Sequence, residues 1–462
     1  MHWSLILCLG STLAALFGLL ALNGAVRRER WRGLWLLVAA ALLIGAGFGA
    51  AETVYQLSVE RAEGEGGDDG SPARPPPTVT PPPTPTPQPL PSSSPTPQPT
   101  LPILPTPSPT VRPTAAPVVP LSTPPGDAGA LAPSLIASER EALAALDDPP
   151  HYTLDVGVDF ETLTVAGTVE ILYTNNEREA LEAIYLRLYP NAEHYEEGET
   201  RIDAVNVDGV AADFVFEDQA RTVLVVPLPA PLPPKAQTTL QIAFSVNVPR
   251  RSDRFGYDEG VMSLGHWYPM LAVYDDEGWN RDPYVALGDA FYSDVAFFTV
   301  HLTVPEDTVV AATGVEVGQV LHRPPRATIT YVSGATRDFA LALSREYETA
   351  SAQVGETTVT SYYLPGHEQG GQQALQVAAD AVEVYNARFG LYPYTELDVA
   401  ETAFVIMGSP GGMEFPGIVF ISSEFYRPGS FFASEMDTVV AHEVAHQWWY
   451  GVVGNNQVDE PW

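Results

Sequence analysis

The sequence has little cysteine and little positive charge. Cys8 is the only cysteine among 462 residues, so no disulfide can form within the chain. Lys and Arg together number 23 against 57 Asp and Glu, which gives a formal net charge of −34. Binding to a phosphate backbone needs clustered Lys and Arg, so this balance excludes nucleic acid as a partner. We attribute the acidity to solubility.

Length and residue distribution divide the chain into regions. A chain of 462 residues is too long for one ordinary domain. Its 44 prolines crowd into one stretch, and its longest apolar runs lie near the N-terminus. The average hydrophobic content of 45% is that of a globular protein, but it hides these differences. We therefore expect a multidomain protein with distinct parts.

Two apolar segments near the N-terminus predict membrane helices. Residues 3–26 and 33–51 are almost wholly apolar, and each approaches the length of about 20 residues that spans a bilayer. The short loop between them is basic, which predicts a cytoplasmic loop with both flanking ends outside. A cleaved signal peptide is the competing interpretation, but the first segment lacks a basic start and a clear cleavage site. Residues 1–55 therefore predict a two-helix anchor in the cell membrane, with the remainder extracytoplasmic.

Residues 56–130 are acidic at first and then rich in Pro, Thr and Ser. Repeats of Pro-Thr and Ser-Pro cannot bury a core and favour extended polyproline II. We predict a disordered, semi-rigid stalk that holds the rest of the chain away from the membrane.

Residues 131–347 carry many short alternating segments separated by turn residues. A short helix is predicted at 138–146, before them. Strands are predicted at 151–160, 163–173, 183–189, 222–227, 238–248, 296–304, 327–332 and 339–343. This density predicts an antiparallel β domain, shaped like a sandwich or a saddle.

The pattern changes over residues 348–462. Apolar residues at helical spacing predict a helix at 372–389, and a second helix is predicted at 434–451. Strands are predicted at 397–404 and 417–422, with a glycine-rich turn between them. Helices and strands mix here, so the fold class of the whole chain is α+β.

The second of these helices carries a metal-binding pattern. His442 and His446 are four residues apart, so a helix presents both imidazoles on one face, where they can reach a tetrahedral Zn²⁺. Glu443 follows the first histidine and can take a proton from a zinc-bound water. A pair of surface histidines is the alternative. The apolar residues around the motif weaken it, because burying an uncompensated His or Glu is costly.

No third ligand follows at a recognised spacing. Val452 occupies the position where metzincins carry their third histidine, which excludes that class. Asp459 and Glu460 are the nearby acids downstream, and we interpret them either as groups that lie behind the metal ligands or as surface groups.

Several further motifs accompany the histidines. They are His442-Glu-Val-Ala-His-Gln-Trp-Trp-Tyr-Gly451, Asp459-Glu-Pro-Trp462, Gly411-Gly-Met-Glu414 and, more weakly, Phe389-Gly-Leu-Tyr-Pro-Tyr394, Arg337-Asp-Phe-Ala-Leu-Ala-Leu343 and Leu186-Arg-Leu-Tyr-Pro-Asn191. In this order they resemble the M1 family of zinc aminopeptidases, the gluzincins, over residues 131–462. The resemblance implies a β domain at 131–347 and a thermolysin-like catalytic domain at 348–462.

The resemblance also implies roles for individual residues. His442 and His446 would be ligands of one zinc ion, and Glu443 would be the general base. Glu414 would bind the free α-ammonium of a peptide substrate, and the backbone of Gly411, Gly412 and Met413 would line that peptide like an added strand. A turn carboxylate is the alternative for Glu414.

The chain departs from the family pattern in three ways. Phe415 replaces the usual Asn, which puts ordinary aminopeptidase specificity in doubt. Gly265-His-Trp-Tyr-Pro-Met270 occurs where many relatives carry another motif, which suggests a divergent bacterial-type branch. The family's glutamate ligand and catalytic tyrosine are expected beyond Trp462, so we expect a truncated site with weak zinc binding and little activity of its own.

Three functions remain open at this point. The motifs favour an extracytoplasmic aminopeptidase, anchored in the membrane, that trims peptides. A non-catalytic peptide-binding or scaffolding protein on the same fold is the second. A thermolysin-type endopeptidase is the third, because Phe415 leaves room for it. The sequence does not determine the oligomeric state.

Overall fold

The computed structural model describes residues 128–460 except 286–287, 289–290, 324 and 407–408. The predicted membrane helices lie outside these described residues, and so does the predicted stalk up to residue 127. The described residues all belong to one compact unit. Within the described part, no helix combines the length and the apolar character needed to cross a membrane.

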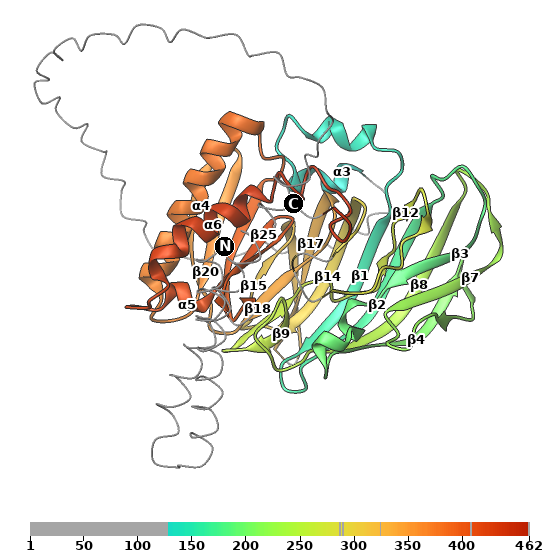
Figure 1. The fold of residues 1–462 in the computed structure, drawn as a ribbon, viewed down its shortest axis with the longest axis horizontal. Helices are drawn as coiled ribbons and strands as arrows, with labels where there is room; N and C mark the ends of the chain where they lie inside the picture. The colour runs from blue at the N-terminus through green and yellow to red at the C-terminus, as the bar shows by residue number, and fades with distance from the viewer. Residues whose placement is uncertain (1–127, 286–287, 289–290, 324, 407–408, 461–462) are drawn as a thin grey trace, which may run out of the picture. The chain divides into compact units, whose positions relative to one another are not determined.

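The largest sheet has eight strands in the order β16-β17-β14-β1-β2-β8-β4-β5 (Figure 1). In chain order they are β1 (His151–Asp159), β2 (Thr164–Thr174), β4 (Glu199–Val207), β5 (Val210–Ala211), β8 (Gln237–Asn247), β14 (Ala296–Pro305), β16 (Val315–His322) and β17 (Arg326–Thr336). An antiparallel sheet was predicted, but β1 and β14 pair in parallel, with His151 opposite Phe297. The two strands are far apart in the sequence, so no hairpin forces them to be antiparallel.

Smaller elements complete the region 131–347. A four-stranded sheet, β11-β3-β7-β6, shares one apolar core with the large sheet. Its strands are β3 (Leu181–Arg187), β6 (Val215–Phe216), β7 (Val223–Leu232) and β11 (Met270–Leu271). A second four-stranded sheet, β15-β18-β10-β9, consists of β9 (Phe255–Asp258), β10 (Val261–Leu264), β15 (Val309–Ala312) and β18 (Leu341–Ser344). The remaining elements are α3 (Ala128–Leu131), η2 (Ala132–Ser134), η3 (Arg140–Ala145), η4 (Tyr189–Asn191), η5 (Glu193–Tyr195), β12 (Tyr274–Asp275) and β13 (Gly278–Trp279).

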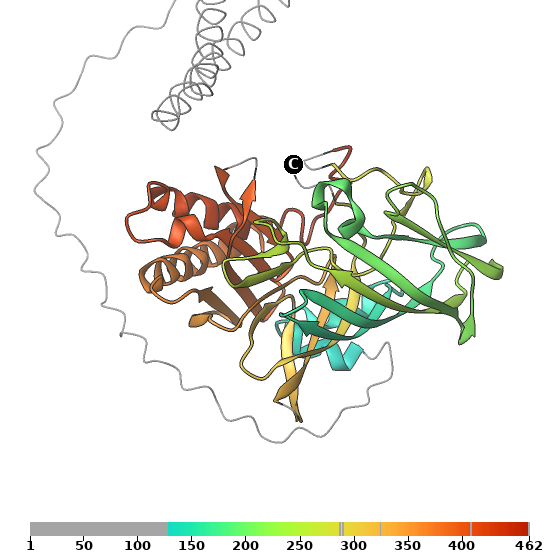
Figure 2. The same cartoon turned by 90° about the horizontal axis from the view of Figure 1, so that it is seen from below.

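A five-stranded mixed sheet follows, in the order β19-β20-β21-β25-β24. Its strands are β19 (Glu348–Val354), β20 (Thr357–Tyr363), β21 (Glu396–Thr402), β24 (Gly412–Phe415) and β25 (Ile418–Ser422). Two helices, α4 (Glu368–Phe389) and α6 (Met436–Ala445), pack against each other on one face of this sheet. Figure 2 shows them in orange and red, on the side away from the green strands. The short elements nearby are α5 (Ser423–Tyr426), η6 (Ala433–Glu435), β22 (Val405–Ile406) and β23 (Ser409–Pro410).

The other face of the five-stranded sheet packs against the β15-β18-β10-β9 sheet. One apolar cluster joins residues of both sheets, among them Ala342 from β18 and Phe420 from β25. A hydrogen bond also crosses this junction, in which Thr313 Oγ1 donates to the carbonyl oxygen of Pro416 over 2.7 Å. Edge strand β24 is therefore held between the β-rich region and helix α6.

Most predicted strands and both long helices are confirmed, with two corrections among the helices. The helix expected at 138–146 is the short 3-10 helix η3. The helix expected at 434–451 ends at Ala445, because the backbone then changes its hydrogen bonding: Gly451 N–H donates to His446 O, five residues back. Gly451 allows this turn, since a Cβ there would lie 2.5 Å from Gln447 O.

Candidate metal centre

Two residues of strand β24, Gly412 and Glu414, face helix α6. Side chains alternate along a strand, so Gly412 and Glu414 share one face while Met413 and Phe415 share the other. The second pair is buried in the apolar cluster between the two sheets. β24 pairs with β25 through a tight hairpin in which Gly417 has a φ of 77°, a conformation that favours glycine. The hairpin thus fixes which face of β24 meets the helix.

Helix α6 is held over this hairpin by its apolar side and by Gln447. Met436, Val440 and Val444 are buried in the core beneath it. Gln447 follows the helix and is itself buried. Its Oε1 accepts from the N–H of Gly417 over 2.8 Å, and its Nε2 donates to the carbonyl oxygen of Phe415 over 2.9 Å. One amide side chain therefore sets the distance between the helix and the hairpin.

The two histidines have the geometry of neighbouring zinc ligands. Their Nε2 atoms are 3.1 Å apart. Two nitrogens bound to a tetrahedral zinc at about 2.0–2.1 Å would be separated by roughly 3.3 Å. Nδ1 of His446 lies 2.7 Å from the carbonyl oxygen of Trp449, so it donates there and leaves Nε2 with a lone pair. Although α6 ends at Ala445, His446 keeps the helical direction, with φ of −63° and ψ of −14°.

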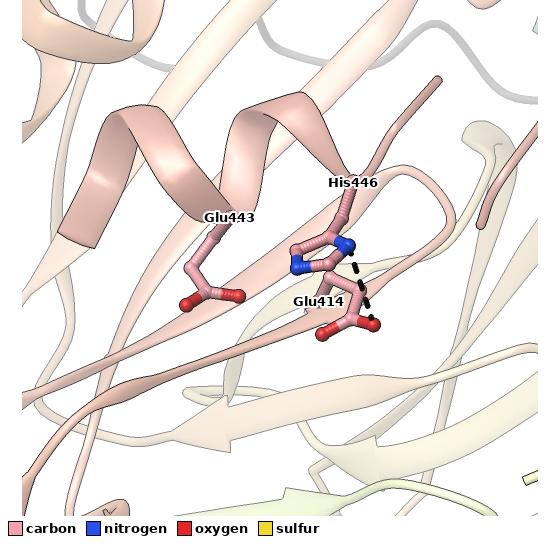
Figure 3. Close-up of side chains that lie close together, drawn as sticks. All are labelled: Glu414, Glu443 and His446. Carbon is pink, nitrogen blue, oxygen red and sulfur yellow. Dashed lines mark ion pairs between the residues drawn. The ribbon is translucent and has the colours of Figure 1, made fainter. Parts of the chain in front are cut away.

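Two carboxylates lie beside the histidines. Ligand atoms of Glu414, Glu443 and His446 all lie within 4.8 Å of one another (Figure 3). His446 Nδ1 is 3.8 Å from Glu414 Oε1, and both carboxyl groups belong to buried residues. Two buried carboxylates so close together repel each other, and a dication would offset that repulsion. The donor set of imidazoles and carboxylates therefore fits Zn²⁺.

Gly412 makes room for the Glu443 side chain. A Cβ on residue 412 would lie 2.4 Å from Cγ and 2.5 Å from Oε1 of Glu443. The glutamate thus rests directly on the backbone of the edge strand. This contact explains why the motif has a glycine two residues before Glu414.

The structure brings most of the predicted site residues together. His442 is on α6 and is exposed, whereas Glu443 faces inward from the same helix. Gly411 precedes β24, and its carbonyl oxygen accepts from Ser422 N–H over 3.0 Å. The Met413 side chain is buried on the far face, so this residue can offer only its backbone.

The downstream acids lie elsewhere. Asp459 and Glu460 are exposed and line an acidic cleft with Asp275, Asp276 and Glu277. Of the two positions predicted for these acids, behind the metal ligands or at the surface, the structure shows the second.

Sequence reasoning missed Gln447. It directly follows the second histidine, and its position inside that motif, just before Trp448, was the available signal. Its two partners, Gly417 and Phe415, are about thirty positions away in the chain, so only the fold reveals them.

Comparisons with known proteins agree with these motifs. No family model matches the chain. It is 23% identical over 347 residues to "Aminopeptidase 2" of Candida albicans, covering 71% of this chain and 35% of that protein. It is 26% identical over 330 residues to "Aminopeptidase N" of Acetobacter pasteurianus, covering 68% of this chain and 86% of that protein.

A solved structure is also similar. The M1 zinc metallopeptidase of Deinococcus radiodurans has 22% identity and a TM-score of 0.48, covering 67% of each chain. The chain spans about a third of the length of the Candida aminopeptidase, of which it covers 35%. The motifs at 411–414 and 442–451 meet at one site, and the chain is similar to these two aminopeptidases over 68% to 71% of its length.

Proposed function

We propose that this protein is a zinc aminopeptidase that removes the N-terminal residue of peptides. The observation that carries the proposal is the 3.1 Å separation of the Nε2 atoms of His442 and His446, with Glu443 and Glu414 beside them. A protein that only binds peptides has no chemical need for this combination.

His442 and His446 would hold the zinc ion. When bound, zinc supplies a Lewis acid that polarises a carbonyl and lowers the pKa of a coordinated water. The Glu443 carboxylate accepts a proton from the attacking water and passes it to the nitrogen of the leaving amine. The contact of Glu443 with Gly412 keeps its oxygens next to the edge strand on which the substrate lies.

Glu414 supports removal of single residues over internal cleavage. The substrate backbone would extend β24 as an added strand, which brings its N-terminus to the Glu414 carboxylate. A buried carboxylate pairs strongly with an ammonium group. An endopeptidase substrate has a neutral amide at that position and offers Glu414 no positive charge. Residues 348–462 would form the thermolysin-like catalytic domain, and 131–347 the saddle-shaped β domain beside it.

We also propose that the protein is anchored in the membrane with its peptidase outside the cytoplasm. The support is the sequence: two apolar segments within residues 1–55, a basic loop between them and a proline-rich stalk at 56–130. Alkaline carbonate washing of membranes should leave the protein in the pellet, and deletion of residues 1–55 should release it. Release of the undeleted protein by the wash would contradict the anchor.

The activity is tested on the full-length protein expressed from its own gene. We expect bound zinc and hydrolysis of leucine or alanine anilides. Glu443→Gln should keep the zinc but lose at least about 100-fold in kcat, the typical contribution of a general base. His446→Ala should lose the zinc itself. Glu383→Gln, an exposed acid on α4, is the matched control and should behave as wild type.

Other results favour the alternative functions. A full-length protein that holds no zinc and cleaves nothing supports the binding or scaffolding function. Cleavage of N-acetylated peptides at rates similar to free peptides supports an endopeptidase.

A further inference from the structure

Phe415 is the residue after Glu414 in strand β24, and its ring is buried on the strand's opposite face. Its exposed fraction is 1%. The ring centroid lies 5.0 Å from that of Phe420 and 5.2 Å from that of His266. His266 belongs to the segment between β10 and β14, so this side chain ties the edge strand to the β-rich region.

The ring of Phe415 fits a notch that exists because residue 265 is glycine. A Cβ at Gly265 would lie 2.3 Å from Cζ and 2.9 Å from Cε1 of Phe415, and 3.0 Å from the carbonyl oxygen of Arg254. Real Cβ atoms do not approach other atoms this closely, so any side chain at 265 must displace the phenylalanine ring or the backbone.

The wall of the notch is itself fixed. The His266 ring stacks on Phe291, with centroids 3.7 Å apart and an interplanar angle of 20°. Its Nε2 lies 3.2 Å from Oδ2 of the buried Asp338. We call Gly265, His266 and Phe291 the Phe415 socket. A close-packed socket holds the ring in one place rather than adapting to it.

The backbone of Phe415 connects to the other side of the site. Its carbonyl oxygen accepts from Gln447 Nε2, and Gln447 follows His446 directly in the chain. Phe415 therefore contacts two parts of the molecule. Its ring packs against the β-rich region, and its carbonyl oxygen is hydrogen-bonded to the residue that follows His446. The neighbouring residue, Glu414, faces the site.

We propose that Phe415 is a positioning residue, and that the Phe415 socket sets the place of Glu414 relative to the two histidines. The inference deepens the proposed aminopeptidase function and rests on it for the role of Glu414. It predicts that disturbing the socket weakens substrate binding through the α-ammonium, although neither the socket nor the Phe415 ring contacts substrate.

Gly265→Ala is the direct test, in the full-length protein. The added methyl should move β24 and raise KM for leucine anilide about tenfold, as loss of a charge-assisted hydrogen bond does, with a smaller change in kcat. Zinc content should be unchanged. Amide hydrogen exchange of the segment 412–422 should become faster. Gly157→Ala is the matched control, because a Cβ there meets its nearest atoms only at 3.5 and 3.8 Å.

A double variant separates positioning from general damage. Leucine lacks the outer ring atoms that the alanine methyl would strike. Gly265→Ala combined with Phe415→Leu should therefore recover KM to within about threefold of wild type and slow the exchange again, a coupling expected only for residues in contact. If Gly265→Ala does not fold, Phe415→Leu alone carries the test, with a KM increase of about threefold from the loosened strand.

The outcomes distinguish this inference from the proposed function. The positioning role is overturned if Gly265→Ala has the same KM and the same hydrogen exchange rates as Gly157→Ala. It is also overturned if the KM of the double variant is no lower than that of the worse single variant. A wild-type protein that cleaves nothing rejects the proposed function instead. The amide hydrogen exchange data alone then show whether the Phe415 socket holds β24 in place.

Discussion

The site needs a residue without a side chain at position 412. The carboxylate of Glu443 occupies the space where any other residue would place its Cβ, at 2.4 Å from Cγ. The sequence indicated Gly412 as backbone lining for a substrate. The structure adds a second reason for the glycine, which is the position of the general base itself.

Gly412→Ala should therefore impair the proposed chemistry more than substrate binding. Displacing a reacting group by about 1 Å can cost about 100-fold in rate, so we expect a loss of that size in kcat with KM changed little. Zinc content should stay at the wild-type level, since the atoms nearest to the added methyl group all belong to Glu443, which is not a proposed zinc ligand. Stopped assays and metal analysis on the same preparation measure both quantities. Wild-type kcat in this variant would show that Glu443 has another position in the working enzyme.

At the residue scale the sequence predicted which side chains gather at the site, but not which residues hold them in place. His442, Glu443, His446 and Glu414 could be identified because their spacing within short motifs reflects their chemistry. Gln447 and the Phe415 socket could not, because their partners are distant in the sequence and only tertiary packing brings them together.

At the scale of elements, the hairpin β24–β25 and helix α6 form one unit. Long, strongly periodic elements such as β2, β8 and α4 were predicted from their patterns. Strands β4, β10, β15 and β20 were missed. β10 and β15 have only four residues each and are mostly buried, so they show no alternation, whereas Thr and Ser at several positions of β20 hide its alternating burial. The predicted end of α6 was also wrong. Apolar and aromatic residues continue past Ala445, but the backbone hydrogen bonds there are no longer those of an α-helix.

Gln447→Leu should loosen this unit. Leucine fills a similar volume but leaves the buried N–H of Gly417 and carbonyl of Phe415 without the partners that Gln447 supplies. Leaving buried polar groups unsatisfied costs about 1–3 kcal/mol each, so we expect the free energy of unfolding to fall by about 2–4 kcal/mol. Urea unfolding measures this change.

Gln376→Leu, on the exposed side of α4, is the control for Gln447→Leu and should change stability by less than about 0.5 kcal/mol. Equal stability of the two variants would mean that the helix and the hairpin are held by apolar packing alone.

At the scale of the whole molecule, the site lies where two sheets and a helix pair meet. The apolar cluster beneath β24 draws residues from β10, β15 and β18 as well as from β25. The sequence predicted both regions, but not that the edge strand is clamped between them. The junction also buries ionisable groups, among them Asp338 and His266.

Asp338 should make the stability of the molecule depend on pH. Burial raises its pKa from 3.8 to about 6, although Tyr268 Oη–H and the N–H of Phe339 donate to its Oδ1. Burial, with Arg254 nearby, lowers the pKa of the facing His266 well below its usual value, so this imidazole is neutral and does not offset the carboxylate charge.

The folded state therefore binds the proton of Asp338 more tightly than the unfolded state, and the free energy of unfolding should fall as pH rises from about 4 to about 6. Above that range the folded protein bears the full cost of the ionised group, about 3 kcal/mol. Asp338→Asn, which mimics the protonated acid, should become more stable relative to wild type by that amount between pH 4 and pH 7. Urea unfolding at several pH values checks this, with the exposed Asp380→Asn as the control for loss of one charge. A stability difference between Asp338→Asn and wild type that stays constant with pH would mean that water or a cation reaches the Asp338 carboxylate and lets it ionise at no cost.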